Sequence, residues 1–138
     1  MFEMFVQMFS ISHGYGFCSC DEYSKVFFRV EDFHKQDHTE PQPILGEKVL
    51  VSQIKEVGRN PKSFSVKRLQ TPILVEAEVQ SFDSVKGWGF ASCYLGTYFI
   101  HKSEFVDSFI PVIGSKVSFY SGKKKGKNRG CYITRSDK

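Results

Sequence analysis

The sequence predicts an all-β protein made of two similar five-stranded barrels in tandem. Short runs rich in β-branched and aromatic residues alternate with turn residues along the chain, and helical periodicity is nearly absent. The chain also repeats itself, because Gly14-Tyr15-Gly16-Phe17 returns as Gly87-Trp88-Gly89-Phe90 at an offset of 73 residues. A repeat of this length indicates two copies of one structural unit. Five evenly spaced strands in each copy are typical of a small closed barrel.

The first half is expected to contain five strands and two polar breaks. His34–Gln42 contains Pro41 and should form a long loop before the fourth strand. Gly58-Arg59-Asn60-Pro61 is a turn signal between the fourth and fifth strands. Glu31-Asp32-Phe33 is expected to form one helical turn after the third strand. The expected strands are Phe5–Ile11, Gly16–Cys20, Lys25–Val30, Lys48–Val57 and Ser63–Arg68.

The second half repeats this order with shorter breaks. Ser103-Glu104-Phe105 is expected to form a helical turn after the third strand. Gly122–Asn128 should form a loop between the fourth and fifth strands. The expected strands are Glu76–Ser84, Gly89–Cys93, Thr97–His101, Lys116–Ser121 and Gly130–Arg135.

The junction between the halves also separates two different charge balances. Thr71-Pro72 interrupts the strand pattern, so we place the junction at residues 69–73 and the domains at residues 1–70 and 71–138. The first domain carries nine basic and nine acidic residues, and the second carries ten and six, which accounts for the net charge of +4. A basic bias concentrated in one half favours a polyanionic partner.

Composition and cysteine usage narrow the class of protein. No apolar run approaches the roughly 20 residues that span a bilayer, and Met1–Val6 lacks the basic start and the length of a secretory signal. We therefore expect no membrane partner and a cytoplasmic protein with four reduced cysteines. Cys18 and Cys20 are the one closely spaced pair, whereas a structural zinc site takes about four ligands, so we expect no metal or other cofactor. No nucleophile–base constellation or phosphate-binding loop is recognisable, so we expect no enzyme activity.

The order of the motifs resembles that of the cold-shock domain, a five-stranded antiparallel barrel of the oligonucleotide-binding (OB) class. In the second half, Lys86-Gly87-Trp88-Gly89-Phe90 resembles the first nucleic-acid-binding motif of that family, and Tyr98-Phe99-Ile100-His101 resembles the second. Gly114–Phe119 resembles its fourth strand. The more divergent segments of the first half are His13–Phe17, Val26–Arg29 and Gly46–Val49.

The resemblance implies binding of single-stranded RNA or DNA, with bases stacked on aromatic side chains of the second and third strands. The family usually has a Lys-Trp pair in the first strand, where this chain has Gln7-Met8 and Gln80-Ser81. Lys102 and Val30 stand where a further aromatic usually follows the second motif. Each copy should therefore keep a reduced stacking surface. The resemblance assigns to nucleic acid Trp88, Phe90, Phe99 and His101 in the second half, and Tyr15, Phe17, Phe27 and Arg29 in the first.

Alternation along the strands supports this assignment independently of the resemblance. The two aromatic residues of each repeated motif share one face of their strand, and small residues share the other. We expect the aromatics to face outward, although in many Gly-x-Gly-Phe segments they are core residues. Each base stacked on such a ring contributes roughly 1–3 kcal/mol. Lys86 and Lys102 are expected to meet phosphates or base edges, and Arg29 to stack on a base or pair with a phosphate.

The segment Lys123–Arg129 is the strongest run of positive charge and is expected to be a hairpin loop. It is either a solvated loop or a phosphate clamp whose binding weakens steeply with salt. The equivalent loop in the first half, Val57–Lys62, has two basic residues, so the second copy should dominate electrostatic capture. The basic residues of the clamp would be Lys123, Lys124, Lys125, Lys127 and Arg129.

Two functions are consistent with the sequence. The first is binding of single-stranded nucleic acid, with RNA favoured, as an RNA chaperone or a regulator of transcription or translation. The second is a protein-interaction module whose barrel surface binds a polymerase, nuclease or ribosomal partner. The loss of the first-strand Trp in both copies and the neutrality of the first copy keep the second function open.

Overall fold

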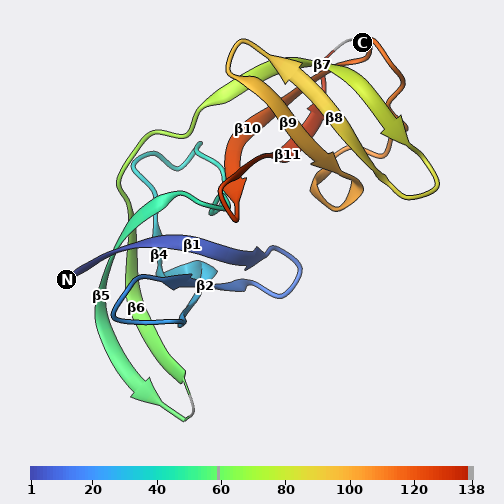
Figure 1. Ribbon diagram of the computed structural model, residues 1–138. Coiled ribbons are helices and arrows are strands. Elements are labelled where there is room, and N and C mark those ends of the chain that lie inside the picture. The colour runs from blue at the N-terminus through green and yellow to red at the C-terminus, as the bar shows by residue number, and fades with distance from the viewer. Residues whose placement is uncertain (59, 137–138) are drawn as a thin grey trace. The chain divides into compact units, whose positions relative to one another are not determined.

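A computed structural model describes residues 1–58 and 60–136. The chain divides into two compact units, Met1–Pro72 and Ile73–Lys138, which are called unit 1 and unit 2 below. Figure 1 shows that each unit is a set of strongly curved strands wrapped around its own interior. The division falls between Pro72 and Ile73.

Unit 2 is a closed barrel of five strands. β7 pairs with β8 and β10, β8 pairs with β9, and β10 pairs with β11, all antiparallel. β11 closes the ring through a parallel pairing of Arg129 with Phe99 in β9. A short 3-10 helix, η2 (Lys102–Glu104), follows β9. The strands are β7 (Leu74–Asp83), β8 (Trp88–Cys93), β9 (Gly96–His101), β10 (Lys116–Lys124) and β11 (Lys127–Arg135).

Unit 1 repeats this arrangement and adds one short strand. β1 lies between β2 and β5, β2 pairs with β3, and β5 pairs with β6, all antiparallel. β6 closes the ring through a parallel pairing of Lys62 with Phe27 in β3. A 3-10 helix, η1 (Val30–Asp32), leads into β4 (Phe33–His34), which pairs with the end of β6. The other strands are β1 (Phe2–Ser10), β2 (Tyr15–Ser19), β3 (Val26–Arg29), β5 (Lys48–Val57) and β6 (Asn60–Arg68).

The strand order is that of the OB barrel, but the expectation of purely antiparallel barrels is wrong. Antiparallel neighbours alternate in direction, and an odd number of strands cannot alternate all the way around a closed ring. One pairing in each five-stranded ring must therefore be parallel, and in both units it joins the third strand to the fifth. This pairing places a basic residue, Lys62 or Arg129, beside the aromatic residue of the third strand.

The hairpin between the last two strands of unit 2 is tighter than the sequence predicts. The expected loop Gly122–Asn128 is reduced to a turn of Lys125 and Gly126, because β10 continues to Lys124 and β11 begins at Lys127. The two turn residues have φ values of 53° and 78°. Positive φ at both central residues is the requirement of a type I′ turn, whose twist matches that of a two-stranded ribbon.

The corresponding hairpin of unit 1 is also short. Asn60 and Pro61, expected in the turn, already belong to β6, and Asn60 pairs with Val57. Arg59, which the sequence places in the same turn, lies outside the described residues. His34, expected at the start of the long loop, is the last residue of β4.

The second glycine of each repeated motif allows two backbones to approach closely. Gly16 in β2 and Gly89 in β8 face the first strand of their own unit where its pairing register shifts. A Cβ atom at Gly16 would collide with the carbonyl oxygen of Met8, and one at Gly89 with that of Ser81. The glycines therefore allow the close contact between the first two strands of each unit. The aromatic residues on either side of each glycine point away from this contact.

Each unit has a separate hydrophobic core filled from alternate positions of its strands. The core of unit 1 is mainly aliphatic and contains the fully buried thiol of Cys18. The core of unit 2 is built around Phe119 and Tyr98, whose ring centroids are 5.1 Å apart. The outward aromatic residues are therefore not needed to fill either interior.

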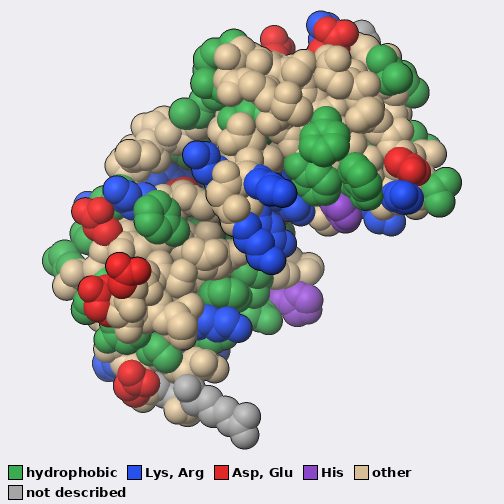
Figure 2. Space-filling model, in the orientation of Figure 1, with side chains coloured by type: hydrophobic (Ala, Val, Ile, Leu, Met, Phe, Trp, Pro, Cys, Tyr) green, Lys and Arg blue, Asp and Glu red, His purple; other side chains and the backbone are tan. Residues whose placement is uncertain are grey.

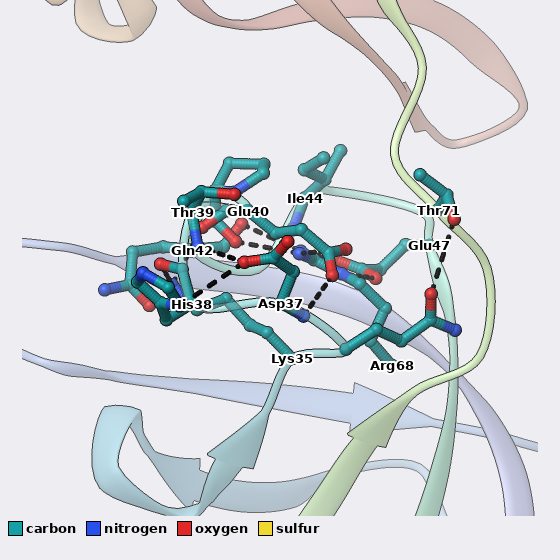
Figure 3. Close-up of polar contacts among 12 residues, drawn as sticks. Lys35, Asp37, His38, Thr39, Glu40, Gln42, Ile44, Glu47, Arg68 and Thr71 are labelled. Atoms are coloured by element: carbon teal, nitrogen blue, oxygen red, sulfur yellow. Dashed lines mark hydrogen bonds and ion pairs between the residues drawn. The ribbon is translucent and has the colours of Figure 1, made fainter.

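A buried arginine fastens the long loop of unit 1, as Figure 3 shows. The Nε and Nη2 atoms of Arg68 donate hydrogen bonds to the carboxylate of Glu47 at 2.8 and 2.7 Å. Its Nη1 and Nη2 atoms also donate to the carbonyl oxygens of Pro41 and Gln42 at 2.8 and 3.1 Å. The Arg68 side chain is completely buried, so these bonds hold the loop against the end of β6.

Candidate nucleic-acid interface

Four rings lie side by side on the outer face of β8 and β9. The register pairs Trp88 with His101 and Phe90 with Phe99. The Phe99 centroid lies 5.8 Å from those of Trp88 and Phe90 and 6.2 Å from that of His101. Trp88 and Phe90 are 37% and 38% exposed. We call this surface the unit 2 platform (Trp88, Phe90, Phe99 and His101).

The hairpin of β10 and β11 adds positive charge beside the unit 2 platform. The guanidinium carbon of Arg129 lies 5.4 Å from the Phe99 centroid, and its Nη2 atom lies 3.6 Å from the carboxylate of Glu104. Lys124, Lys125 and Lys127 line a hollow of about 660 Å³ together with Arg129 and the three larger rings of the platform. In Figure 2, hydrophobic side chains of this unit lie next to a histidine and a group of basic side chains.

The remaining predicted lysines of unit 2 lie outside this hollow. Lys123 is exposed in β10, opposite Asn128. Lys86 is exposed in the turn between β7 and β8, where its backbone N–H donates to the Asp83 carboxylate. Lys102 is exposed in η2, and its side-chain carbons lie over Gly87. None of these three lysines lines the hollow.

His101 forms a neutral, polar end of the unit 2 platform. Its Nδ1 atom accepts a hydrogen bond from the backbone N–H of Ser103 at 3.0 Å. Burial lowers the pKa of His101 below its ordinary value, and the positive charges of Arg129 and Lys102 lower it further. The imidazole is therefore neutral near pH 7, with its proton on Nε2. A flat neutral ring with one free donor suits contact with a base.

The predicted residues of unit 1 also meet on one surface. The register pairs Tyr15 with Arg29 and Phe17 with Phe27. The Phe27 centroid lies 6.4 Å from that of Tyr15 and 5.6 Å from that of Phe17. The ammonium of Lys25 lies 4.9 Å from the Phe17 centroid. Arg29 and Tyr15 are exposed, whereas the two phenylalanines are partly buried.

Sequence reasoning missed two residues of this surface, Lys62 and Phe64. Both line a hollow of about 960 Å³ that also includes Tyr15, Phe27 and Arg29. Lys62 reaches it because β6 pairs in parallel with β3. Phe64 is 43% exposed. No local sequence signal gives the position of Lys62, because the pairing joins segments that are far apart in the chain.

The exposure of Phe64 could not be predicted from the sequence, because the alternation of buried and exposed residues in β6 is interrupted next to it. Val66 is buried, so simple alternation would bury Phe64 as well. Instead Ser63 is buried, and its hydroxyl donates to the carbonyl oxygen of Ser52 on β5. The neighbouring residue Gln53 has a φ of 52°, in the left-handed region. This local distortion turns Phe64 outward.

The four cysteines are free thiols in the structure. Burial, and secondarily the charge of Glu47, raises the pKa of the Cys18 thiol to about 12, so it stays protonated. Within residues 1–58 and 60–136, no group of three or more His, Cys, Asp or Glu side chains is placed to hold a metal ion. No helix in this part of the chain is long and apolar enough to cross a membrane.

Strand order and register define the fold: two OB-type barrels in tandem. No family model matches the chain. No curated protein matches it either. Among solved structures, a structure of Drosophila Unr CSD456 matches over 98% of this chain with 17% sequence identity and a TM-score of 0.38. The chain spans 62% of the length of that structure.

Proposed function

We propose that the protein binds single-stranded RNA or DNA, and that it acts in the cytoplasm as an RNA chaperone or a regulator of transcription or translation, without catalysis. The observation that carries the proposal is the unit 2 platform beside the basic hairpin of β10 and β11. Stacking on exposed rings next to a positive groove is the usual way in which proteins hold single strands without reading their sequence.

The chemistry of the surface fits the two parts of a single strand. The rings of Trp88, Phe90 and Phe99 offer faces for bases, and each stacked base contributes roughly 1–3 kcal/mol. Lys124, Lys125 and Lys127 supply charge for the phosphates that join those bases. A duplex would hide its base faces from such a surface, so unpaired strands are the favoured ligand.

A fluorescence titration of Trp88 tests the proposal, because Trp88 is the one tryptophan of the chain and lies in the platform. Short single strands should quench its emission, and quenching should weaken as salt is raised. Substituting Phe99→Ala should weaken binding by about 5- to 150-fold, which corresponds to the 1–3 kcal/mol of one stacked base.

Tyr94→Ala is the matched control for that substitution. Tyr94 is an aromatic residue of the same unit, 80% exposed in the turn between β8 and β9, and it lies outside the platform. Its loss should leave the affinity near that of the wild type. Absence of quenching at micromolar strand would rule out the proposal, as would equal losses in the Tyr94 and Phe99 variants.

One observation favours the second candidate function, binding of a protein partner. The segment after η2 exposes four aliphatic side chains by between 62% and 77%: Val106, Ile110, Val112 and Ile113. Exposed apolar side chains gathered in this way are typical of protein contacts. If this function holds, Ile110→Ser with Ile113→Ser should abolish capture of a partner while leaving Trp88 quenching by oligonucleotides intact. Unchanged capture would remove the support that this segment gives.

A further inference from the structure

We propose that unit 1 is the base-selecting part of the protein, and that its hollow accepts a guanine base. The inference rests on the proposed function, since the base must belong to a bound single strand. It goes beyond general stacking because it assigns a preference for one base to named side chains of unit 1.

The first observation is the shape of the hollow. Rings of Tyr15, Phe27 and Phe64 contribute to its lining, and they come from three different strands, β2, β3 and β6. Its volume of about 960 Å³ is at the upper end of the roughly 300–1,000 Å³ of small-molecule pockets. A flat base with its sugar therefore has room in the hollow.

The second observation is that the hollow carries charges of both signs. Arg29 and Lys62 line it together with the carboxylate residues Glu31 and Asp32 of η1. Among the residues that the structure describes, none of these four side chains has an opposite charge within 4.0 Å. Asp32 accepts one long hydrogen bond, 3.4 Å, from the backbone N–H of Arg29. The four groups are thus available to a ligand.

The hollow of unit 2 has no such carboxylates. Its charged lining residues are Lys124, Lys125, Lys127 and Arg129, all of them basic. Such a lining suits phosphates, which every strand carries. Two carboxylates would repel a phosphate, so the hollow of unit 1 is better matched to the edge of a base.

Guanine fits this combination of charges better than the other bases. It presents adjacent N1–H and N2–H donors on one edge, and these match carboxylate oxygens such as those of Glu31 and Asp32. It presents the acceptors O6 and N7 on another edge, and these match Arg or Lys. Cytosine and adenine offer a single amino group, and uracil and thymine offer none.

The test compares strands that differ at one base. A labelled pyrimidine-rich strand with one central guanine is titrated with the full chain, and its anisotropy is compared with that of strands carrying adenine, cytosine or thymine there. The wild type should prefer the guanine strand by about 30-fold, near the middle of the range for one good bidentate base contact. Glu31→Gln with Asp32→Asn should reduce that preference to near unity. The readout is the affinity ratio, because loss of two negative charges strengthens binding of every strand.

The matched control is Glu3→Gln with Asp21→Asn, which removes two exposed carboxylates of unit 1 that do not line the hollow. This control should keep the guanine preference. Asp32 contacts the backbone of Arg29, so the double variant also alters a local hydrogen bond. Glu31→Gln alone, at an exposed residue, keeps the test decisive and should also lower the preference. Phe64→Ala should lower affinity for the guanine strand more than for the others.

The outcomes separate this inference from the proposed function. Trp88 quenching that depends on salt, together with equal affinity for all four strands, would overturn the guanine inference alone. A guanine preference that survives both Glu31→Gln and the double variant would also overturn it. If no strand quenches Trp88 or changes the anisotropy, both the proposed function and this inference fail.

Discussion

The two units share one strand order but place their charges differently. In unit 2 the basic residues gather on a tight hairpin beside exposed rings, and the hollow there has only basic charged residues. In unit 1 the corresponding surface mixes Arg29 and Lys62 with Glu31 and Asp32. The comparison shows that two barrels with one strand order can both carry outward aromatic residues while the charged residues beside those rings differ.

The units also differ in how they are stabilised. Unit 1 carries a long segment between β4 and β5 that is held by the buried side chain of Arg68. Unit 2 has a shorter segment between η2 and β10, and Arg135, its residue at the corresponding end of the last strand, is exposed. The two units therefore differ at this position: the arginine of unit 1 is buried and ion-paired, and that of unit 2 is exposed.

The largest expected effect comes from removing that ion pair. Arg68→Met should lower the free energy of unfolding of unit 1 by roughly 3–5 kcal/mol, because Glu47 would keep its charge in a largely buried place without a cationic partner. Thermal unfolding followed by far-ultraviolet circular dichroism should show an early transition, while Trp88 fluorescence reports unit 2 unchanged. Lys67→Met, at the exposed neighbour, is the control. A single unshifted transition in the Arg68 variant would contradict the difference drawn between the units.

The repeated glycines give the next largest effect, and it should be similar in both units. Gly16→Ala or Gly89→Ala forces a Cβ atom against the carbonyl oxygen of Met8 or Ser81. We expect a loss of roughly 1–3 kcal/mol of unfolding free energy in the unit concerned, as for other overpacked sites. Ser19→Ala, on the outer side of β2, should cost much less. Thermal unfolding of the variants measures this, and an unchanged midpoint for Gly89→Ala would argue against the close approach of β7 and β8.

The basic hairpin should govern the salt dependence of binding. Replacing Lys124, Lys125 and Lys127 together by Ala should reduce the slope of log affinity against log salt by about 2, at about 0.7 for each phosphate contact of a single strand. Lys123→Ala is a matched control, because Lys123 is adjacent in sequence but does not line the hollow. It should change the slope less than Lys124→Ala does. Equal changes would show that the hollow has no special part in phosphate contact.

The smallest effect concerns the pH dependence of unit 2. Because the pKa of His101 is lower in the folded protein than its ordinary value, the unfolded chain binds the proton more tightly. The contribution to stability is therefore present above the ordinary histidine pKa and is lost as pH falls through the lowered folded pKa. Between pH 7.5 and pH 5, the midpoint of unfolding monitored by Trp88 should fall more in the wild type than in His101→Gln. The difference between the two falls should be that expected from the titration of one histidine. An identical fall would mean that His101 does not titrate differently on folding.

Much of the fold was accessible from local sequence patterns. The repeated Gly-aromatic-Gly-Phe motif gave the second strand of each unit, and Lys48–Val57 is β5 with the bounds that were predicted. The outward positions of Trp88 and Phe90 follow from alternation with Gly89 and Ala91, which is a local property of a strand. Their function in binding stays a prediction.

Other features could not be predicted from local sequence patterns, because they depend on residues distant in the chain. The antiparallel expectation failed at ring closure, where the third strand meets the fifth. The loop expected at Lys123–Arg129 is a two-residue turn in the structure, because β10 and β11 remain paired as far as Lys124 and Lys127. The burial of Arg68 required Glu47 and the carbonyl oxygens of the long loop to come together around it.

The sequence by itself therefore determined two β units, their strands and the aromatic faces of the second and third strands, because a strand's alternation is set by neighbours in the chain. Only the tertiary structure decided which charges stand beside those faces. Lys62 and Arg129 reach the third strand by barrel closure, and Phe64 turns outward where β5 is distorted at Gln53. These placements come from pairing between distant segments: Lys62 and Arg129 make the two aromatic surfaces alike, and the exposed Phe64 distinguishes that of unit 1.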